Sequence, residues 1–151
     1  MPPSETVRAL VLERLGGRPR VEEIEVPEPG PGEVRVRMLA SGVCHTDLAA
    51  PRDAFRAPLV LGHEGCGEVE SIGDGVTAPT PGARVVLSIA TACGRCRQCR
   101  SGRRAVCAHL LDLREGRSRW QGEPIPGLLS LGCFSELVVV PADAAVPIEE
   151  A

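Results

Sequence analysis

Lysine is absent from this sequence, because all 17 basic residues among its 151 are arginine. That absence excludes chemistry that needs a lysine amine, such as Schiff-base formation. Aromatic residues make up only 2% of the chain, so a core must be built from valine, leucine, isoleucine and alanine. The length fits one domain of ordinary size. A net charge of −3 argues against general binding to nucleic acid or to membranes.

Long apolar runs and export signals are also missing. No stretch approaches the ~20 apolar residues that span a bilayer. Residues 1–6 have no basic region followed by an apolar run, so no secretory signal is expected. The seven cysteines are therefore expected to be reduced thiols or metal ligands rather than disulfides, in a cytoplasmic protein. No G-x-G-x-x-G motif joins a strand to a helix, so no dinucleotide-binding unit is expected within these residues.

Short segments of branched apolar residues alternate with turns rich in glycine and proline. This pattern predicts strands over residues 7–13, 21–26, 33–40, 65–72, 84–89 and 134–140. A short helix is expected to begin near Cys44, and residues 110–129 are expected to be polar and irregular. Many short strands between such turns indicate a β-rich α+β or barrel-like domain.

The segment 33–40 (EVRVRMLA) has the clearest alternation of the predicted strands. Apolar side chains fall on one face, and Arg35 and Arg37 fall on the other. In the segment 65–72 (GCGEVESI), the glycines mark places where two backbones can approach closely. Cys66, between these glycines, is interpreted as a small buried apolar residue.

Four cysteines follow the spacing C-x2-C-x2-C-x7-C: Cys93, Cys96, Cys99 and Cys107. Four thiolates complete the tetrahedral coordination that zinc prefers, so the spacing predicts a structural zinc in a lobe of residues 90–110. The alternative is a set of free thiols or scattered disulfides. Five arginines in this lobe can offset the negative charge of a zinc–thiolate centre. A nucleic-acid-binding finger is disfavoured, because the ligand set has no histidine and no aromatic residue interrupts the basic stretch.

A second group of potential ligands lies upstream, where Cys44 and His63 each have polar neighbours. A mixed, incomplete ligand set is what a catalytic zinc needs, since one position must stay free. Taken singly, a cysteine is usually a core residue and a histidine a satisfied polar one. The other interpretations also stay open: a helix N-cap for Thr46, a first-turn helix acid for Asp47 and a plain surface residue for His45.

In combination, these segments resemble the zinc-dependent medium-chain alcohol dehydrogenase family. The resemblance runs in order through residues 42–47 (GVCHTD), 62–67 (GHEGCG) and the four-cysteine lobe. It also includes residues 29–34, 81–85 and 132–136, and it covers nearly the whole chain. It implies that residues 1–151 form a GroES-like, partly open β-barrel with a four-cysteine zinc lobe. It further implies an oxidoreductase that interconverts alcohols and aldehydes by hydride transfer to NAD or NADP.

The resemblance implies metal ligands residue by residue. Cys44 and His63 would bind the catalytic zinc, and Glu64 would lie beside it and bind it transiently. Asp47 would orient His63, as acidic partners of zinc-binding histidines commonly do. Cys93, Cys96, Cys99 and Cys107 would hold the structural zinc.

The remaining roles concern the proton and the cofactor. Thr46 would begin the proton relay from the bound alcohol, and His45 would pass the proton on or contact the cofactor pyrophosphate. A small alcohol or aldehyde would be the substrate, and oligomers occur in the family.

The chain departs from the family pattern at its end. The family's third ligand to the catalytic zinc is a cysteine that falls beyond Ala151, as do the Rossmann domain and the C-terminal strands of the catalytic domain. In addition, Ala83 replaces the usual acid of a Pro-Gly-Asp turn. The expectation is an incomplete catalytic domain that is inactive alone and whose Rossmann domain is supplied in cis or in trans. The alternatives are a free-standing zinc-binding module or truncated fragment without turnover, and a small zinc-finger interaction protein.

Overall fold

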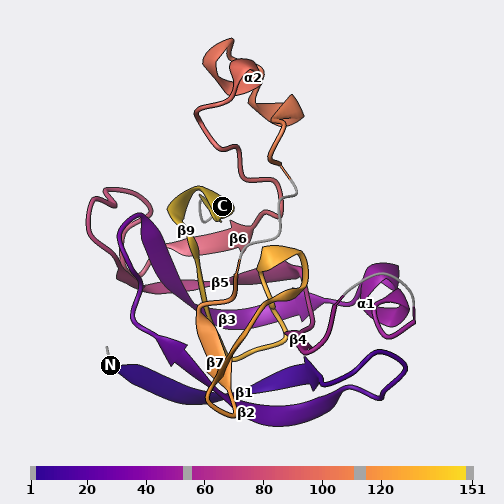
Figure 1. The fold of residues 1–151 in the computed structure, drawn as a ribbon. Coiled ribbons are helices and arrows are strands. Elements are labelled where there is room, and N and C mark those ends of the chain that lie inside the picture. Colours follow the sequence, from indigo (N-terminus) through magenta and orange to yellow (C-terminus); the bar gives the residue numbers. More distant parts are fainter. Residues whose placement is uncertain (1–2, 53–55, 111–114, 149–151) are drawn as a thin grey trace.

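Two five-stranded sheets make up most of the molecule, and a small lobe projects from them (Figure 1). The computed structural model describes residues 3–52, 56–110 and 115–148. The first sheet has the order β4-β1-β2-β7-β8, with bounds Leu59–Val60, Ser4–Leu12, Arg20–Pro27, Ser118–Trp120 and Glu123–Ile125. The second has the order β10-β6-β5-β3-β9, with bounds Ala145–Pro147, Arg84–Leu87, Glu64–Ile72, Glu33–Gly42 and Leu137–Pro141. The strand pairs within both sheets are antiparallel.

The segment just before β9 joins the two sheets into a curled half-barrel. Its backbone pairs with β1: the Leu10 amide donates to the Phe134 carbonyl at 2.7 Å, and the Glu136 amide donates to the Arg8 carbonyl at 3.0 Å. One residue later the chain becomes β9 and pairs with β3 in the other sheet. This architecture confirms the predicted β-rich, partly open barrel.

Aliphatic side chains fill the interior, as the shortage of aromatic residues predicts. Val34, Val36, Val69, Val85 and Val140 are fully or almost fully buried in the second sheet. On the first sheet the largest fully buried side chains are Leu12, Ile125, Val11 and Val26. Each such side chain contributes about 1.5–3 kcal/mol when it is removed from water. The two aromatic rings described in the structure, Trp120 and Phe134, are only partly buried against these clusters.

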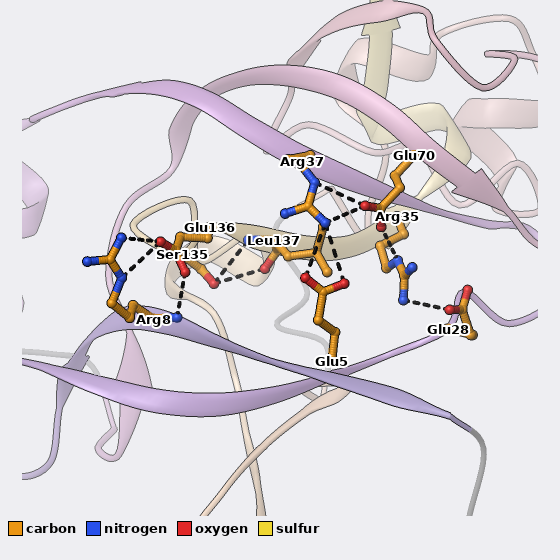
Figure 2. A network of polar contacts seen from close by, with 9 residues as sticks. All are labelled: Glu5, Arg8, Glu28, Arg35, Arg37, Glu70, Ser135, Glu136 and Leu137. Atoms are coloured by element: carbon orange, nitrogen blue, oxygen red, sulfur yellow. Dashed lines mark hydrogen bonds and ion pairs between the residues drawn. The ribbon is translucent and has the colours of Figure 1, made fainter.

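Arg35 departs from the expected alternation along β3. Its side chain is only 11% exposed, although the sequence places it on the face opposite the core. It lies between two carboxylates, at 2.7 Å from Glu28 and 2.6 Å from Glu70 (Figure 2). Two ion pairs compensate the cost of removing a guanidinium from water, which is why this position tolerates burial.

Helix α1 (His45–Ala49) begins where the sequence predicts. The expectation of irregular structure over residues 110–129 is wrong in part, because β7 and β8 form a hairpin and a 3-10 turn, η2, spans Leu128–Ser130. Residues 111–114 of that segment lie outside the described residues. The very short strands β4 and β10 were not predicted either.

The four-cysteine lobe stands apart from both sheets (Figure 1). It contains a short helix, α2 (Arg97–Arg100), and a 3-10 turn, η1 (Arg104–Val106). A further 3-10 turn, η3 (Ala142–Ala144), connects β9 to β10. Among the described residues, no helix has the length and apolar character needed to cross a membrane.

Candidate metal centres

The sulfur atoms of the four lobe cysteines converge on one point. All four lie within 4.8 Å of one another. The Cys96 sulfur lies 3.5 Å from that of Cys99 and 3.9 Å from that of Cys107. Cys96 is the N-cap of α2, so the start of this helix fixes the second cysteine relative to the third. Gly94, with φ at +72°, supplies the left-handed turn between the first two.

Backbone amides point at these sulfurs. The Cys96 amide donates to the sulfur of Cys93 at 3.3 Å, and the Cys99 amide donates to the sulfur of Cys96 at 3.5 Å. The amides of Cys93 and His109 donate to the sulfur of Cys107, at 3.4 and 3.3 Å. Sulfur accepts such bonds best as a thiolate, which is the form that binds metal.

The acidity of the thiols differs sharply across the lobe. Amide hydrogen bonds, that of Cys99 first and that of Ala108 second, lower the pKa of Cys96 to about 6. Burial, and then the hydrogen bond with Cys96, raises the pKa of Cys99 to about 12. The four sulfurs therefore cannot all ionise near neutral pH without a cation between them. An all-sulfur, four-donor set of this compactness fits zinc.

The second cluster forms where the start of α1 meets the start of β5. Ligand atoms of Cys44, His63 and Glu64 lie within 4.8 Å of one another. Cys44 is the N-cap of α1, and Glu64 opens β5 opposite Gly42 of β3. A side chain at Gly42 would collide with Glu64, because an added Cβ would lie 2.5 Å from its carboxylate oxygen. This mixed sulfur, nitrogen and oxygen set fits a zinc that keeps an exchangeable position.

The carboxylate of Asp47 fixes both halves of this cluster. It is buried, with 4% exposure, in the first turn of α1. One oxygen accepts the Cys44 amide at 3.0 Å, and the other accepts the Gly62 amide at 2.9 Å. That second oxygen also lies 3.4 Å from Nδ1 of His63. Asp47 is therefore a first-turn helix acid that also holds the backbone on both sides of the site.

Gly62 and the adjacent residues Cys133 and Phe134 also support the second cluster. Gly62 has φ at +89°, and an added Cβ would lie 2.4 Å from the Phe134 nitrogen and 2.7 Å from its ring. The Cys133 amide donates to the Gly62 carbonyl at 2.8 Å. Burial raises the pKa of the Cys133 thiol to about 12, so this thiol stays neutral. Sequence reasoning missed the supporting role of Gly62 and Phe134, whose only signal is a glycine directly before a candidate ligand.

The other predicted residues lie on α1 or outside both clusters. The Thr46 hydroxyl lies 3.6 Å from the Cys44 sulfur. Because Cys44 is the N-cap of α1, the N-cap interpretation of Thr46 is wrong. His45 is exposed at the first position of the helix. Cys66 is half-buried on the outer face of β5, so its interpretation as a buried residue is wrong.

Comparison with known proteins gives a consistent relationship. Residues 30–150 match the alcohol dehydrogenase GroES-like domain. Alcohol dehydrogenase 6 of Rattus norvegicus is 35% identical over 95% of this chain, and the NDMA-dependent alcohol dehydrogenase of Amycolatopsis methanolica is 36% identical over 95%. The crystal structure of an alcohol dehydrogenase zinc-binding domain protein from Burkholderia ambifaria superposes with a TM-score of 0.89, at 30% identity over 98% of this chain.

These relatives are longer proteins. The chain spans 41% of each of the two sequences and 43% of the crystallised chain. The family match covers most of the chain, and the half-barrel agrees with it in fold. The chain belongs to the alcohol dehydrogenase family, and its residues 30–150 match the GroES-like domain of that family.

Proposed function

We propose that this protein supplies the metal-binding part of an alcohol dehydrogenase-type oxidoreductase, which interconverts an alcohol and an aldehyde by hydride transfer to NAD or NADP. One observation carries the proposal: Cys44, His63 and Glu64 converge beside the Thr46 hydroxyl, above the buried Asp47 carboxylate. Family membership supports the reaction class. The substrate is a small alcohol or aldehyde, and the compartment is the cytoplasm.

The second cluster would hold the catalytic zinc, and the four-cysteine lobe would hold a structural one. A bound zinc is a Lewis acid that makes a coordinated alcohol more acidic. Asp47 would keep the His63 ring oriented, because its carboxylate oxygen lies 3.4 Å from Nδ1, and it fixes the backbone on which Cys44 sits. The ligand atom of Glu64 lies within 4.8 Å of those of Cys44 and His63, and Glu64 would bind the metal transiently.

Two side chains of α1 would move the proton outward. The Thr46 hydroxyl lies next to the Cys44 sulfur, where it can accept a proton from the substrate alcohol. His45 precedes it at the exposed start of the helix and would receive that proton, or contact the cofactor pyrophosphate. The Rossmann domain that binds the cofactor, and the third zinc ligand, would come from polypeptide outside these 151 residues, in cis or in trans. The whole enzyme would be an oligomer.

Counting zinc in cysteine variants tests this assignment. We expect two zinc ions per chain by native mass spectrometry and elemental analysis. Cys93→Ser should lose one and Cys44→Ser the other, while Cys66→Ser, a cysteine outside both clusters, should keep both. Cobalt substitution provides an independent readout, because Cys44→Ser should leave the thiolate-to-cobalt absorption of the lobe intact.

A single zinc that survives Cys44→Ser would refute the assignment of a metal site to Cys44, His63 and Glu64 within these 151 residues. The chain would then be a zinc-binding module without turnover, whose single zinc is held by the four-cysteine lobe.

A further inference from the structure

Charge is unevenly divided between the lobe and the rest of the chain. Residues 90–110 contain five arginines and no acidic residue. The other 12 arginines are outnumbered by 20 acidic residues, so the remainder of the chain carries −8 against +5 in the lobe. A separation of this size between a projecting lobe and its body creates a strong local field.

The five lobe arginines all lie on the surface of the lobe: Arg95, Arg97, Arg100, Arg103 and Arg104. Arg104 pairs with Asp143 of η3 at 3.5 Å, and Arg103 contacts the Ser101 hydroxyl of its own lobe. The guanidinium groups of the other three have no hydrogen bond or ion pair with any residue that the structure describes. The lobe projects away from both sheets (Figure 1), and Arg95, Arg97 and Arg100 are all exposed on it.

The negative charge of the cysteine sulfurs does not account for the number of arginines in the lobe. Backbone amides are the donors to the lobe sulfurs, and among the described residues no arginine side chain donates to one. Zinc with four thiolates carries a formal charge of roughly −2. That leaves a charge of roughly +3 on the lobe, carried by exposed arginine side chains.

We propose that the arginine face of the lobe is a docking surface for an acidic segment of another polypeptide. Guanidinium groups match carboxylates with paired hydrogen bonds, and interfaces are enriched in arginine and depleted of lysine. Val106, 60% exposed on the same 3-10 turn as Arg104, adds an apolar side chain to this surface.

An acidic peptide fits this surface better than a nucleic acid. The range 90–110 contains no phenylalanine, tyrosine or tryptophan on which bases could stack. A long polyanion would also be repelled by the net charge of −8 on the body, whereas a short acidic segment contacts the lobe alone. Screening over about 8 Å at physiological salt keeps the two regions electrically distinct.

A fluorescent ten-residue glutamate peptide is the probe for the test, with binding to the zinc-loaded chain followed by anisotropy. We expect salt-dependent binding that Arg97→Glu/Arg100→Glu weakens by about tenfold or more, because two attractions become repulsions. The matched control is Arg18→Glu/Arg20→Glu, which makes the same change in net charge at exposed positions around the start of β2. The control should bind within about twofold of the unchanged chain.

Zinc content shows whether the lobe of each variant is intact. If Arg97→Glu/Arg100→Glu loses its lobe zinc, Arg95→Glu in the turn after Cys93 replaces it in the comparison. Equal weakening by the lobe and control variants would overturn the proposal, because only net charge would then matter. Absence of peptide binding at low salt would overturn it too. So would tighter binding of a ten-nucleotide oligothymidylate than of the peptide at equal ionic strength.

Discussion

Gly62 has the tightest backbone position in the second cluster, and its replacement should be costly. Gly62→Ala forces a Cβ to within 2.4 Å of the Phe134 nitrogen at a φ of +89°. We expect a loss of more than about 2 kcal/mol in the free energy of unfolding, together with loss of the Cys44–His63 metal. Urea denaturation and zinc content measure both effects.

Gly16→Ala is the matched control for that variant. Gly16 also has a positive φ, +76°, but an added Cβ meets nothing within 4 Å. It should cost about 1 kcal/mol and leave metal binding unchanged. Equal costs at the two glycines would mean that the contact with Phe134 does not constrain the site.

Asp47 is a second residue on which the geometry of this cluster depends, because its carboxylate holds the backbone at both Cys44 and Gly62. In Asp47→Asn one of the two carboxylate oxygens becomes an amide donor, which cannot accept from the Cys44 or Gly62 amide. We expect zinc affinity at the second cluster to fall about 10–100-fold, with the four-cysteine site unchanged. Titration against a chelator of known affinity measures the zinc affinity of each site separately. An unchanged zinc affinity at the second cluster would contradict the role given to Asp47.

Short local spacing explains which of these residues could be predicted from the sequence. The four lobe cysteines lie within 15 residues, and the structure brings their sulfurs together as the spacing requires. Gly62 and Phe134 are 72 positions apart, and only the pairing of residues 134–136 with β1 brings them into contact. Arg35 was misplaced because alternation cannot show that Glu28 and Glu70 flank it.

The lobe, taken as an element, has almost no core of its own. Within residues 90–110 only Cys107 is buried, and Arg104 forms an ion pair with Asp143 of the body at 3.5 Å. A segment with so few apolar contacts depends on its metal for order. Removal of zinc by a chelator should therefore abolish hydrogen-exchange protection across residues 93–107 and leave β3, β5 and β9 protected. Simultaneous loss in those strands would show that the lobe stabilises the barrel.

Strand prediction succeeded where the apolar pattern is long and failed where pairing is short. β2 and β3 extend the predicted segments by one or two residues. The β7–β8 hairpin was missed because each strand has three residues, and its turn has Gln121 at φ +53° before Gly122 rather than asparagine or aspartate. The predicted strand 134–140 starts late, at Leu137, because residues 134–136 pair with β1 instead.

For the whole molecule, ion pairs cross the junction of the two sheets (Figure 2). Arg37 of β3 pairs with Glu5 of β1 at 3.2 Å and also with Glu70 of β5. Arg8 of β1 pairs with Glu136, just before β9. The sequence showed the charges but not the junction, because the partners lie up to 128 positions apart.

These contacts predict that stability declines in acid. Partial burial favours a higher pKa for Glu70, but the Arg37 hydrogen bond and the Arg35 charge outweigh it, so the net pKa of Glu70 is lowered. Hydrogen bonds from Arg8 lower the pKa of Glu136. A lowered carboxyl pKa stabilises the fold above the unfolded value of about 4.3, and this contribution is lost as the pH falls through the folded pKa.

Urea unfolding at pH 7 and at pH 3 measures that contribution. Glu70→Gln should lower the free energy of unfolding at pH 7 by about 1 kcal/mol or less, because Glu70 is partly exposed and screened by solvent. At pH 3 the variant and the unchanged chain should differ less, because the contribution of Glu70 is lost as the pH falls toward and through its lowered folded pKa. Glu123→Gln, at an exposed carboxyl without an ion pair among the described residues, should be neutral at both values. If Glu70→Gln is neutral at pH 7, the ion pairs of Glu70 with Arg35 and Arg37, which lie within the second sheet, contribute no measurable stability.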